Sequence, residues 1–212
     1  MYNIVNRESM YSQNNEEQII LKYFGVEKGT VLDIGANDGK TLSNSYACIL
    51  RGWQGVMVEP SSKCFESLFQ LHQGNCSVFS FNFAIAEKTG TLDFYESGEH
   101  LKNGDHGLLS TLKESELERW KGSDNKFTKT KARAVTFKRF LELSRVKKFD
   151  LISIDAEGVD YEILKQMDLE KLGCKMLIVE TNGVENEKYI DYCAKFGMTI
   201  YHRNQENLIF VK

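Results

Sequence analysis

The chain has almost no proline and no paired cysteine motif, and both absences narrow what it can be. Its 212 residues contain one proline, Pro60, which excludes a proline-rich linker between domains. The five cysteines are odd in number and scattered, and no two of them form a CxxC pair, so we expect neither a zinc site nor a disulfide framework. They indicate instead reduced, mostly buried thiols in a cytoplasmic protein.

Long apolar runs and a strong charge of one sign are also missing. No stretch approaches the roughly 20 apolar residues that a membrane-spanning helix needs, and residues 1–15 lack the apolar segment of a signal peptide. The formal net charge of −3 gives no reason to expect nucleic-acid or membrane binding. Length and composition are those of one globular domain, so we expect a single domain over residues 1–212.

What the chain does contain is an alternation of strand-like and helix-like segments. We expect helices at residues 16–24, 40–50, 160–167 and 185–196, and another after Pro60 that Ser61 or Ser62 can cap. Expected strands cover residues 31–34, 54–59, 78–86, 90–95, 149–155 and 176–180, followed by a hairpin of 199–203 and 207–211. This alternation predicts an α/β fold, with helices on both faces of a mostly parallel sheet and an antiparallel strand at one side.

Two segments stand apart from that alternation. Residues 1–29 precede the first strand and include the first expected helix. Residues 97–134 are rich in glycine and charge and poor in large apolar side chains. They predict a long mobile excursion with one helical piece at about residues 114–120. Because long loops in compact domains usually have a function, we expect a lid or a substrate-binding segment here.

The most informative segment is residues 30–39, Thr-Val-Leu-Asp-Ile-Gly-Ala-Asn-Asp-Gly, a short strand that ends in a glycine turn. Such a turn directs backbone N–H groups toward a ligand, and Asp33 lies where a carboxylate can meet a cationic group. The turn lacks the third glycine of a dinucleotide fingerprint and has Asn37 instead, which tolerates a left-handed backbone. It favours a nucleoside-type cofactor that carries an amine, although a tight turn without a ligand would have the same sequence.

Glu59 supports the cofactor interpretation. It ends the second expected strand about 20 residues after the turn, where an acid binds the ribose hydroxyls of an adenosine cofactor. Alone it could be an ordinary solvated acid, but its pairing with Asp33 favours the ribose role. Ligands of an open parallel sheet bind at the carboxyl ends of the strands, which here also include residues 84–86, 155–158 and 180–183.

These residues lead to a family. The segments 11–13 (Tyr-Ser-Gln), 33–44, 52–61, 82–86 and 154–160 resemble those of FkbM-type S-adenosylmethionine-dependent methyltransferases, from about Tyr11 onward. The blocks Trp-x-Gly-x-x-x-Glu-Pro and Ile-Asp-x-Glu-Gly are more specific than the glycine turn. The resemblance implies the Rossmann-like class I methyltransferase fold, with seven strands of which the last is antiparallel. It also implies O-methylation, commonly of sugar hydroxyls or other metabolite alcohols.

The resemblance also assigns roles by position. Asp33 and Gly35 would hold the methionine end of S-adenosylmethionine, Glu59 would hold the ribose, and Asp155 would lie beside the methyl group and the acceptor. Asn82, Ala84 and Ile85 would lie near the adenine, and the remaining cofactor-binding candidates are Asn37, Gly39 and Pro60.

Two interpretations of the chemistry remain open. In the first, Asp155, Glu180 and Asn182 bind Mg²⁺ or Mn²⁺, because catechol O-methyltransferase-like enzymes place acid, acid and amide ligands at these strand ends, and Glu157 is a further ligand or the base. In the second, no metal binds, and His106 or Glu157 takes the acceptor proton. The catalytic candidates are therefore Asp155, Glu157 and His106. Glu180 could equally bind a backbone N–H, and Asn182 could simply belong to a turn.

The acceptor is less well specified. We expect a sugar, a nucleotide sugar or a glycan; Trp120, Phe127 or Tyr95 could stack on its ring, although burial is the commoner role of aromatic side chains. A basic group could hold an anionic acceptor, although a solvated face is favoured: Lys126, Lys129, Lys131 and Arg133. The alternatives are a methyltransferase of non-sugar metabolites, an NAD-dependent enzyme and a non-catalytic cofactor-binding module. A nucleic-acid methyltransferase is disfavoured, because the Asn/Asp-Pro-Pro-aromatic block is absent.

Overall fold

The main sheet has the predicted architecture. The structure is a computed structural model that describes residues 11–98 and 107–212. Within them, seven strands pair in the order β3-β2-β1-β7-β8-β10-β9. The strands β1, β2, β3, β7 and β8 pair in parallel, and β10 runs antiparallel to both of its neighbours, β8 and β9. The bounds of the strands are Thr30–Ile34 (β1), Gln54–Val58 (β2), Val78–Phe81 (β3), Leu151–Ile154 (β7), Met176–Glu180 (β8), Thr199–Arg203 (β9) and Asn207–Val211 (β10).

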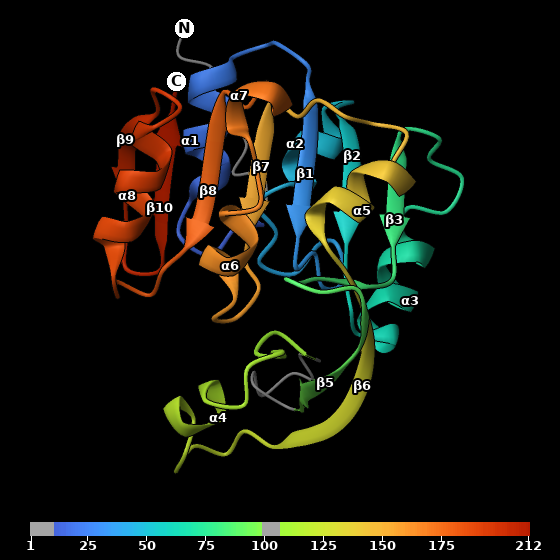
Figure 1. Ribbon diagram of the computed structural model, residues 1–212. Helices are drawn as coiled ribbons and strands as arrows, with labels where there is room; N and C mark the ends of the chain where they lie inside the picture. The colour runs from blue at the N-terminus through green and yellow to red at the C-terminus, as the bar shows by residue number, and fades with distance from the viewer. Residues whose placement is uncertain (1–10, 99–106) are drawn as a thin grey trace, which may run out of the picture.

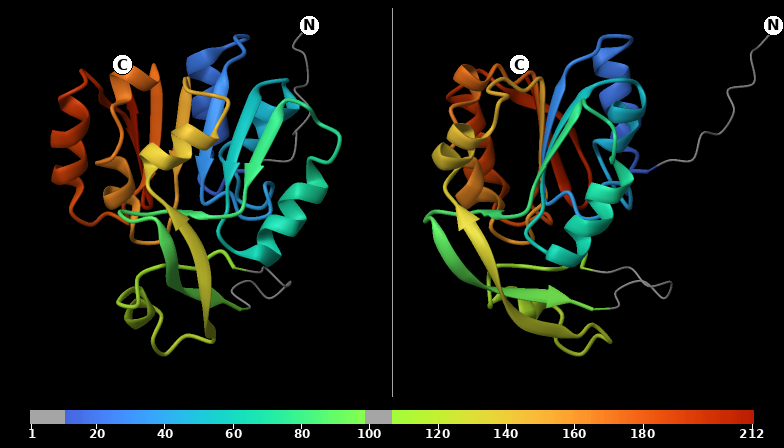
Figure 2. Two further views of the ribbon diagram at one scale, coloured as in Figure 1. Left: turned by 45° about the vertical axis from the view of Figure 1, so that its right-hand side comes forward. Right: turned by 90° about the vertical axis from the view of Figure 1, so that its right-hand side faces the viewer.

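Helices cover both faces of this sheet, as predicted (Figure 1, Figure 2). On one face lie α1 (Glu16–Phe24), α2 (Tyr46–Leu50) and α3 (Ser62–Leu71), which bury Ile20, Cys48 and Leu68 in one hydrophobic core. On the other lie α5 (Phe137–Leu143), α6 (Asp160–Leu164), α7 (Leu169–Leu172) and α8 (Asn186–Ala194). These bury Phe140, Ile163 and Tyr189 in a second core.

The strands divide their side chains between the two cores with a period of two. Val31 of β1 packs in the α1–α3 core and Leu32 in the opposite core, and Ile178 and Val179 of β8 divide in the same way. Successive strand residues point to opposite faces. The same alternation continues to the carboxyl ends of the strands. There it directs five polar side chains to the α1–α3 side: Asp33, Glu59, Ser153, Asp155 and Glu180. The period therefore brings acids from four strands to one side of one sheet edge.

A second, smaller sheet lies beyond the carboxyl ends of the parallel strands (Figure 1). It has the order β4-β6-β5, with β4 at Ala84–Ile85, β5 at Gly90–Ser97 and β6 at Phe127–Val135. The strands β5 and β6 form a long antiparallel pair that curves away from the main sheet (Figure 2). The small sheet therefore faces the carboxyl ends of the parallel strands, and its strand β4 contributes to the cavity described below.

The small sheet corrects two predictions. The strand expected at residues 78–86 is divided between β3 and β4, and the Asn82 amide holds the bend by donating to the carbonyl groups of Glu59 and Pro60. The excursion expected through residue 134 ends earlier, because residues 127–134 belong to β6. The helical piece expected at residues 114–120 is the single turn α4, Glu116–Arg119.

The helix expected at residues 40–50 starts six residues late, at Tyr46. Asp38 is the reason, because its Oδ1 accepts the N–H groups of Lys40 and Thr41 at 2.8 and 2.7 Å. Leu42 then adopts a left-handed backbone with φ of 53°. These local bonds compete with a helix, so residues 40–45 form an irregular segment along the edge of the sheet.

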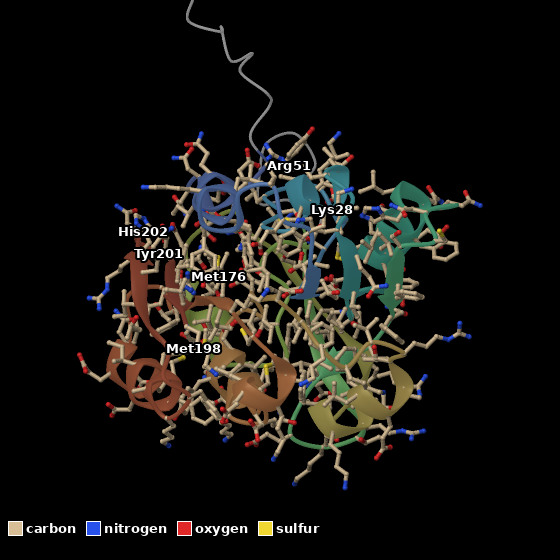
Figure 3. All side chains as sticks on the ribbon, turned by 90° about the horizontal axis from the view of Figure 1, so that it is seen from above. Lys28, Arg51, Met176, Met198, Tyr201 and His202 are labelled. Carbon is tan, nitrogen blue, oxygen red and sulfur yellow. The ribbon has the colours of Figure 1, made fainter. Side chains whose placement is uncertain are left out.

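The edge strand β9 has exposed side chains along its whole length. Tyr201 and His202 of β9 lie at the outer side of the molecule, seen from the amino ends of the parallel strands in Figure 3. The Tyr201 ring packs edge-on against Tyr23 of α1, with ring centroids 5.7 Å apart. In residues 11–98 and 107–212, no helix is long and apolar enough to cross a membrane.

Candidate functional site

A cavity of about 200 Å³ opens at the carboxyl ends of β1, β2, β7 and β8. Most of the predicted site residues line it: Asp33, Gly35, Asn37, Glu59, Pro60, Ala84, Ile85, Asp155, Glu157, Glu180 and Asn182. The predicted candidates Gly39 and Asn82 are not part of its lining. His106 lies outside the described residues. The fold thus brings most of the predicted cofactor, metal and catalytic residues to one cavity.

The glycine turn lies against the end of the neighbouring strand. Gly35 has φ of 87°, and a Cβ atom there would lie 1.7 Å from the carbonyl oxygen of Asp155. Only glycine permits this approach, which places the turn and the Asp155 loop side by side. Asn37 has the left-handed backbone that its residue type suggested, with φ of 48°. Gly39 serves packing, because a Cβ atom there would lie 2.5 Å from Leu68 of α3.

Asp33 is buried at the base of the cavity and has one strong partner. The Ser45 hydroxyl donates to its Oδ2 at 2.5 Å. Burial raises the pKa of Asp33 to about 6, although the Ser45 hydrogen bond lowers it. The Asn44 amide nearby donates to the Ser153 hydroxyl at 3.2 Å. Polar groups from β1, β7 and the segment before α2 therefore converge here.

Glu59 joins the glycine turn to the start of α3. Its Oε2 accepts the Asn37 N–H at 2.8 Å, and its Oε1 accepts the Ser61 N–H at 2.7 Å. Ser61 in turn caps α3, as predicted, by accepting the Cys64 N–H. Burial nevertheless raises the pKa of Glu59 to about 7, against the effect of the two backbone donors. Each oxygen keeps a second lone pair for a ligand hydroxyl.

Three carboxylates form a compact group at the other half of the cavity. Asp155, Glu157 and Glu180, which we call the acid cluster, offer oxygens that all lie within 4.8 Å of one another. Asp155 faces the open cavity, whereas Glu157 and Glu180 are buried. Within the described part of the chain, Glu180 Oε2 is buried without a hydrogen bond. A buried carboxylate oxygen without a donor is costly unless a proton or a cation meets it.

The acid cluster holds its protons tightly. Because the protein surrounds these groups, and because their charges repel one another, the pKa values of Asp155 and Glu157 are raised well above the usual range. The pKa of Glu180 is also raised by burial, although the Asn182 side chain and Arg119 oppose the shift. Behind them, the buried Asp160 accepts the N–H groups of Ala156 and Gly158, and burial raises its pKa to about 8.

Sequence reasoning missed Arg119, which α4 brings to the cavity wall. Its guanidinium lies 5.2 Å from the centroid of the Trp120 ring, and both residues line the cavity. Among the described residues of the lining, Arg119 is the single basic side chain, against six carboxylates: Asp33, Glu59, Asp155, Glu157, Glu180 and Glu206. No local signal points to Arg119, because only the long-range docking of α4 places it there.

The predicted basic group does not reach the cavity lining. Lys129 lies 3.1 Å from Asp93, and Lys131 pairs with the same carboxylate on the exposed surface of the β5–β6 pair. Of the predicted stacking residues, Trp120 lines the cavity, whereas Tyr95 is buried and pairs through its backbone with Thr111. The favoured interpretation of these lysines as a solvated face agrees with their ion pairs.

Comparison with known proteins identifies the family. Residues 33–199 match the methyltransferase FkbM domain. No curated protein matches the chain.

Solved structures are similar to this chain at low sequence identity. Methyltransferase FkbM from Methylobacillus flagellatus KT is 11% identical with a TM-score of 0.53, over 87% of this chain and 44% of that one. Monomeric WbdD is 11% identical with a TM-score of 0.51, over 94% and 41% of the two chains. Precorrin-6Y C5,15-methyltransferase from Geobacter metallireducens GS-15 is 9% identical with a TM-score of 0.49, over 96% and 94%.

The chain spans less than half the length of the first two of these proteins. Their likeness shows the fold, and the matched domain covers most of the sequence, including the glycine turn, Glu59 and the acid cluster. This chain belongs to the family of FkbM methyltransferase domains.

Proposed function

We propose that this protein transfers the methyl group of S-adenosylmethionine, the cofactor expected of its family, to a hydroxyl group of a neutral sugar or glycan. One observation carries the proposal. A single cavity joins the Asp33–Glu59 half, which suits an adenosine cofactor with an amine, to an acid cluster that can serve the reaction.

The Asp33–Glu59 half would bind the cofactor. The Glu59 carboxylate would accept hydrogen bonds from the ribose hydroxyls, while its bonds to Asn37 and Ser61 keep it in place. Asp33 would meet the ammonium group, which favours its ionised form. Ala84 and Ile85 offer a buried apolar surface for the adenine. Asn82 would act indirectly, by fixing the chain at Glu59 and Pro60.

The acid cluster would then serve the acceptor. S-adenosylmethionine would supply an activated methyl group: its bond from sulfur to the methyl carbon would break as a bond from that carbon to the acceptor oxygen forms, leaving a neutral thioether. The hydroxyl proton would pass to a carboxylate, either Asp155, which is open to the cavity, or Glu157 beside it. Their raised pKa values make them stronger bases than solvated carboxylates.

The acid cluster also fits a divalent cation. Glu180 has a buried oxygen without a donor, and three neighbouring carboxylates repel one another until a positive charge joins them. Asp155, Glu157 and Glu180 would hold Mg²⁺ or Mn²⁺, with Asn182 at the rim, because such ions prefer oxygen ligands. The cation would supply positive charge that lowers the pKa of the acceptor hydroxyl. Without it, Glu157 or Asp155 would take the proton unaided.

The charge of the lining bears on the acceptor. Six carboxylates and one arginine would repel an anionic group, so a neutral sugar is favoured over the diphosphate of a nucleotide sugar. Mass spectrometry of neutral glycans and nucleotide sugars incubated with S-adenosylmethionine, with and without EDTA, tests this. We expect one added CH₂ unit on a neutral acceptor and less product with EDTA. Product from nucleotide sugars alone would contradict the acceptor class, and stabilisation by NAD but not by S-adenosylmethionine would contradict the cofactor.

A further inference from the structure

A short segment outside the matched family domain also forms part of the cavity wall. Residues 11–15, which we call the N-terminal strap, precede α1. Ser12 of the strap forms a parallel bridge with Leu42 at the edge of the cavity. Gln13 lines the cavity itself. The strap lies on the α1–α3 side of the main sheet, the side to which Asp33 and Glu180 point.

Two buried acids of α1 hold the strap in place. Glu17 Oε2 accepts the Tyr11 N–H at 2.7 Å, and the Glu17 N–H donates back to the Ser12 hydroxyl at 3.1 Å. Glu16, which is 0% exposed, accepts the Asn14 N–H at 2.8 Å through its Oε2. Its other oxygen accepts the side-chain amides of Asn204 and Asn207 in and beside the β9–β10 hairpin.

The strap is also tied to the cavity rim. The Asn14 amide donates to Glu206 at 2.6 Å, and Glu206 lines the cavity. A buried carboxylate is costly unless hydrogen bonds satisfy it. Glu16 and Glu17 obtain these bonds in part from the strap, so the strap is held in one position.

Gln13 is the exception within this network. Its side chain is exposed at the cavity, and within the described part of the chain its amide makes no hydrogen bond. A rigidly held segment therefore presents one amide with unused donors to the proposed cofactor site. Such an arrangement suits a group that contacts a ligand.

The position of Gln13 indicates which part of the cofactor it would contact. Through Ser12 and Leu42 the strap adjoins the segment that contains Ser45, the partner of Asp33. The hydroxyl protons of that segment are already used. Thr41 donates to Asp38, and Ser43 donates to the Ser45 hydroxyl at 3.2 Å, because the Ser45 proton goes to Asp33. Arg119, the arginine of the lining, lies at the other half, where its charge opposes the rise in the pKa values of Glu157 and Glu180. An anionic group near Asp33 would therefore need another donor, and the Gln13 amide offers one.

We propose that Gln13 binds the α-carboxylate of the methionine part of S-adenosylmethionine, by donating its side-chain N–H. This assignment rests on the proposed function, because it needs an amino-acid-bearing cofactor beside Asp33. A neutral amide suits this place, since it binds the carboxylate without cancelling the attraction of Asp33 for the ammonium group.

Calorimetry with two nucleosides tests the assignment. S-adenosylhomocysteine carries the amino-acid part, and 5′-methylthioadenosine lacks it. We expect Gln13→Ala to weaken S-adenosylhomocysteine binding about tenfold, the loss typical of a hydrogen bond to a charged group, and to leave methylthioadenosine binding unchanged. Gln13→Glu should weaken the first ligand further through charge repulsion. Gln73→Ala, an exposed glutamine away from the cavity, should change neither.

Each other outcome overturns the assignment. Equal affinity of wild type and Gln13→Ala for S-adenosylhomocysteine would show that Gln13 makes no contact with the carboxylate. Equal loss for both nucleosides would show a structural role. If wild type bound neither nucleoside, the proposed function would fail and this inference with it, whereas the first two outcomes leave the proposed function intact.

Discussion

Both halves of the cavity contain carboxylates, but the protein provides these carboxylates with hydrogen-bond donors to different extents. At the ends of β1 and β2, Asp33 has a hydroxyl donor at 2.5 Å, and Glu59 has a backbone N–H on each oxygen. At the ends of β7 and β8, the carboxylates of the acid cluster face one another, and Glu180 has a buried oxygen without a donor in the described chain.

This difference separates two kinds of site. The first half is organised before any ligand arrives, because protein donors already fix its carboxylates, and it needs only the hydroxyl and ammonium groups of a cofactor. The second half lacks a compensating positive charge, since burial, and then the repulsion between its acids, raises the pKa values of Asp155 and Glu157. A site of the second kind is stabilised by a cation or by protons. Under the proposed function, it is also where an acceptor hydroxyl would lose its proton.

The largest expected effect is on the second half. Asp155→Ala should reduce methyl transfer by about 10²- to 10⁴-fold, the range for loss of a general base or a metal ligand. Cofactor affinity should change little, because Asp33 and Glu59 keep their partners. Turnover and calorimetry on the same preparation check this. An equal loss of binding and turnover would mean that Asp155 serves the cofactor.

The next effect is on the first half. Glu59→Ala should weaken S-adenosylhomocysteine binding about 10- to 100-fold, because hydrogen bonds to a charged group contribute about 1.5–3 kcal/mol. Glu59→Gln should lose less, since an amide oxygen still accepts. Because Glu59 also holds Asn37 and Ser61, a melting curve of each variant must accompany the titration. Unchanged affinity in Glu59→Ala would remove its ribose role.

A moderate effect is expected from pH. Asp160 has a pKa of about 8 in the folded protein instead of 3.8, so the folded state keeps a proton that the unfolded state releases. Its stabilising contribution is present at low pH and is lost as pH rises from about 4 to about 8. The pKa values of Glu59 and Asp33 are raised to about 7 and about 6, so these two groups also stabilise the folded protein less as the pH rises.

We therefore expect the melting temperature of the ligand-free protein to fall by a few degrees between about pH 5 and about pH 8. Mg²⁺ should reduce this slope, because it replaces protons at the acid cluster, and Asp160→Asn should reduce it too. Thermal unfolding across this range gives the slopes. A melting temperature that rises with pH in the wild type would contradict the assigned pKa shifts.

The smallest effect is expected outside both halves. Lys129→Ala and Lys131→Ala should leave the rate of methyl transfer unchanged, because both side chains are exposed, pair with Asp93 and do not reach the cavity lining. A tenfold rise in KM for an acceptor would show that the β5–β6 pair extends the binding site beyond the cavity.

Much of the cavity could be predicted from the sequence because its residues follow strands. Parallel strands bring their carboxyl ends to one edge, so Asp33, Glu59, Asp155 and Glu180 converge whatever the loops do. The helix and strand periods that set the main sheet are also local in sequence. Gly39 and Asn82 show the limit of this reasoning, since both belong to the predicted motifs but do not line the cavity: Gly39 packs against Leu68, and the Asn82 amide donates to the Glu59 carbonyl.

What was not predictable depends on contacts between distant parts of the chain. The strand β6 reads as a charged loop, Phe-Thr-Lys-Thr-Lys-Ala-Arg-Ala-Val, and is a strand because β5 pairs with it. Arg119 reaches the cavity only because α4 docks there. The late start of α2 follows from the bonds of Asp38 to the next residues, a local competition that helical periodicity does not reveal.

The separation of the two halves is tested most directly by one calorimetric comparison, in which S-adenosylhomocysteine and Mg²⁺ are each titrated into Glu59→Gln and Glu180→Gln. The proposed division predicts that Glu59→Gln loses affinity for the nucleoside and keeps Mg²⁺, while Glu180→Gln loses Mg²⁺ and keeps the nucleoside. If either variant lost both ligands, or if the wild type bound no Mg²⁺, the assignment of cofactor and cation to separate halves would be contradicted.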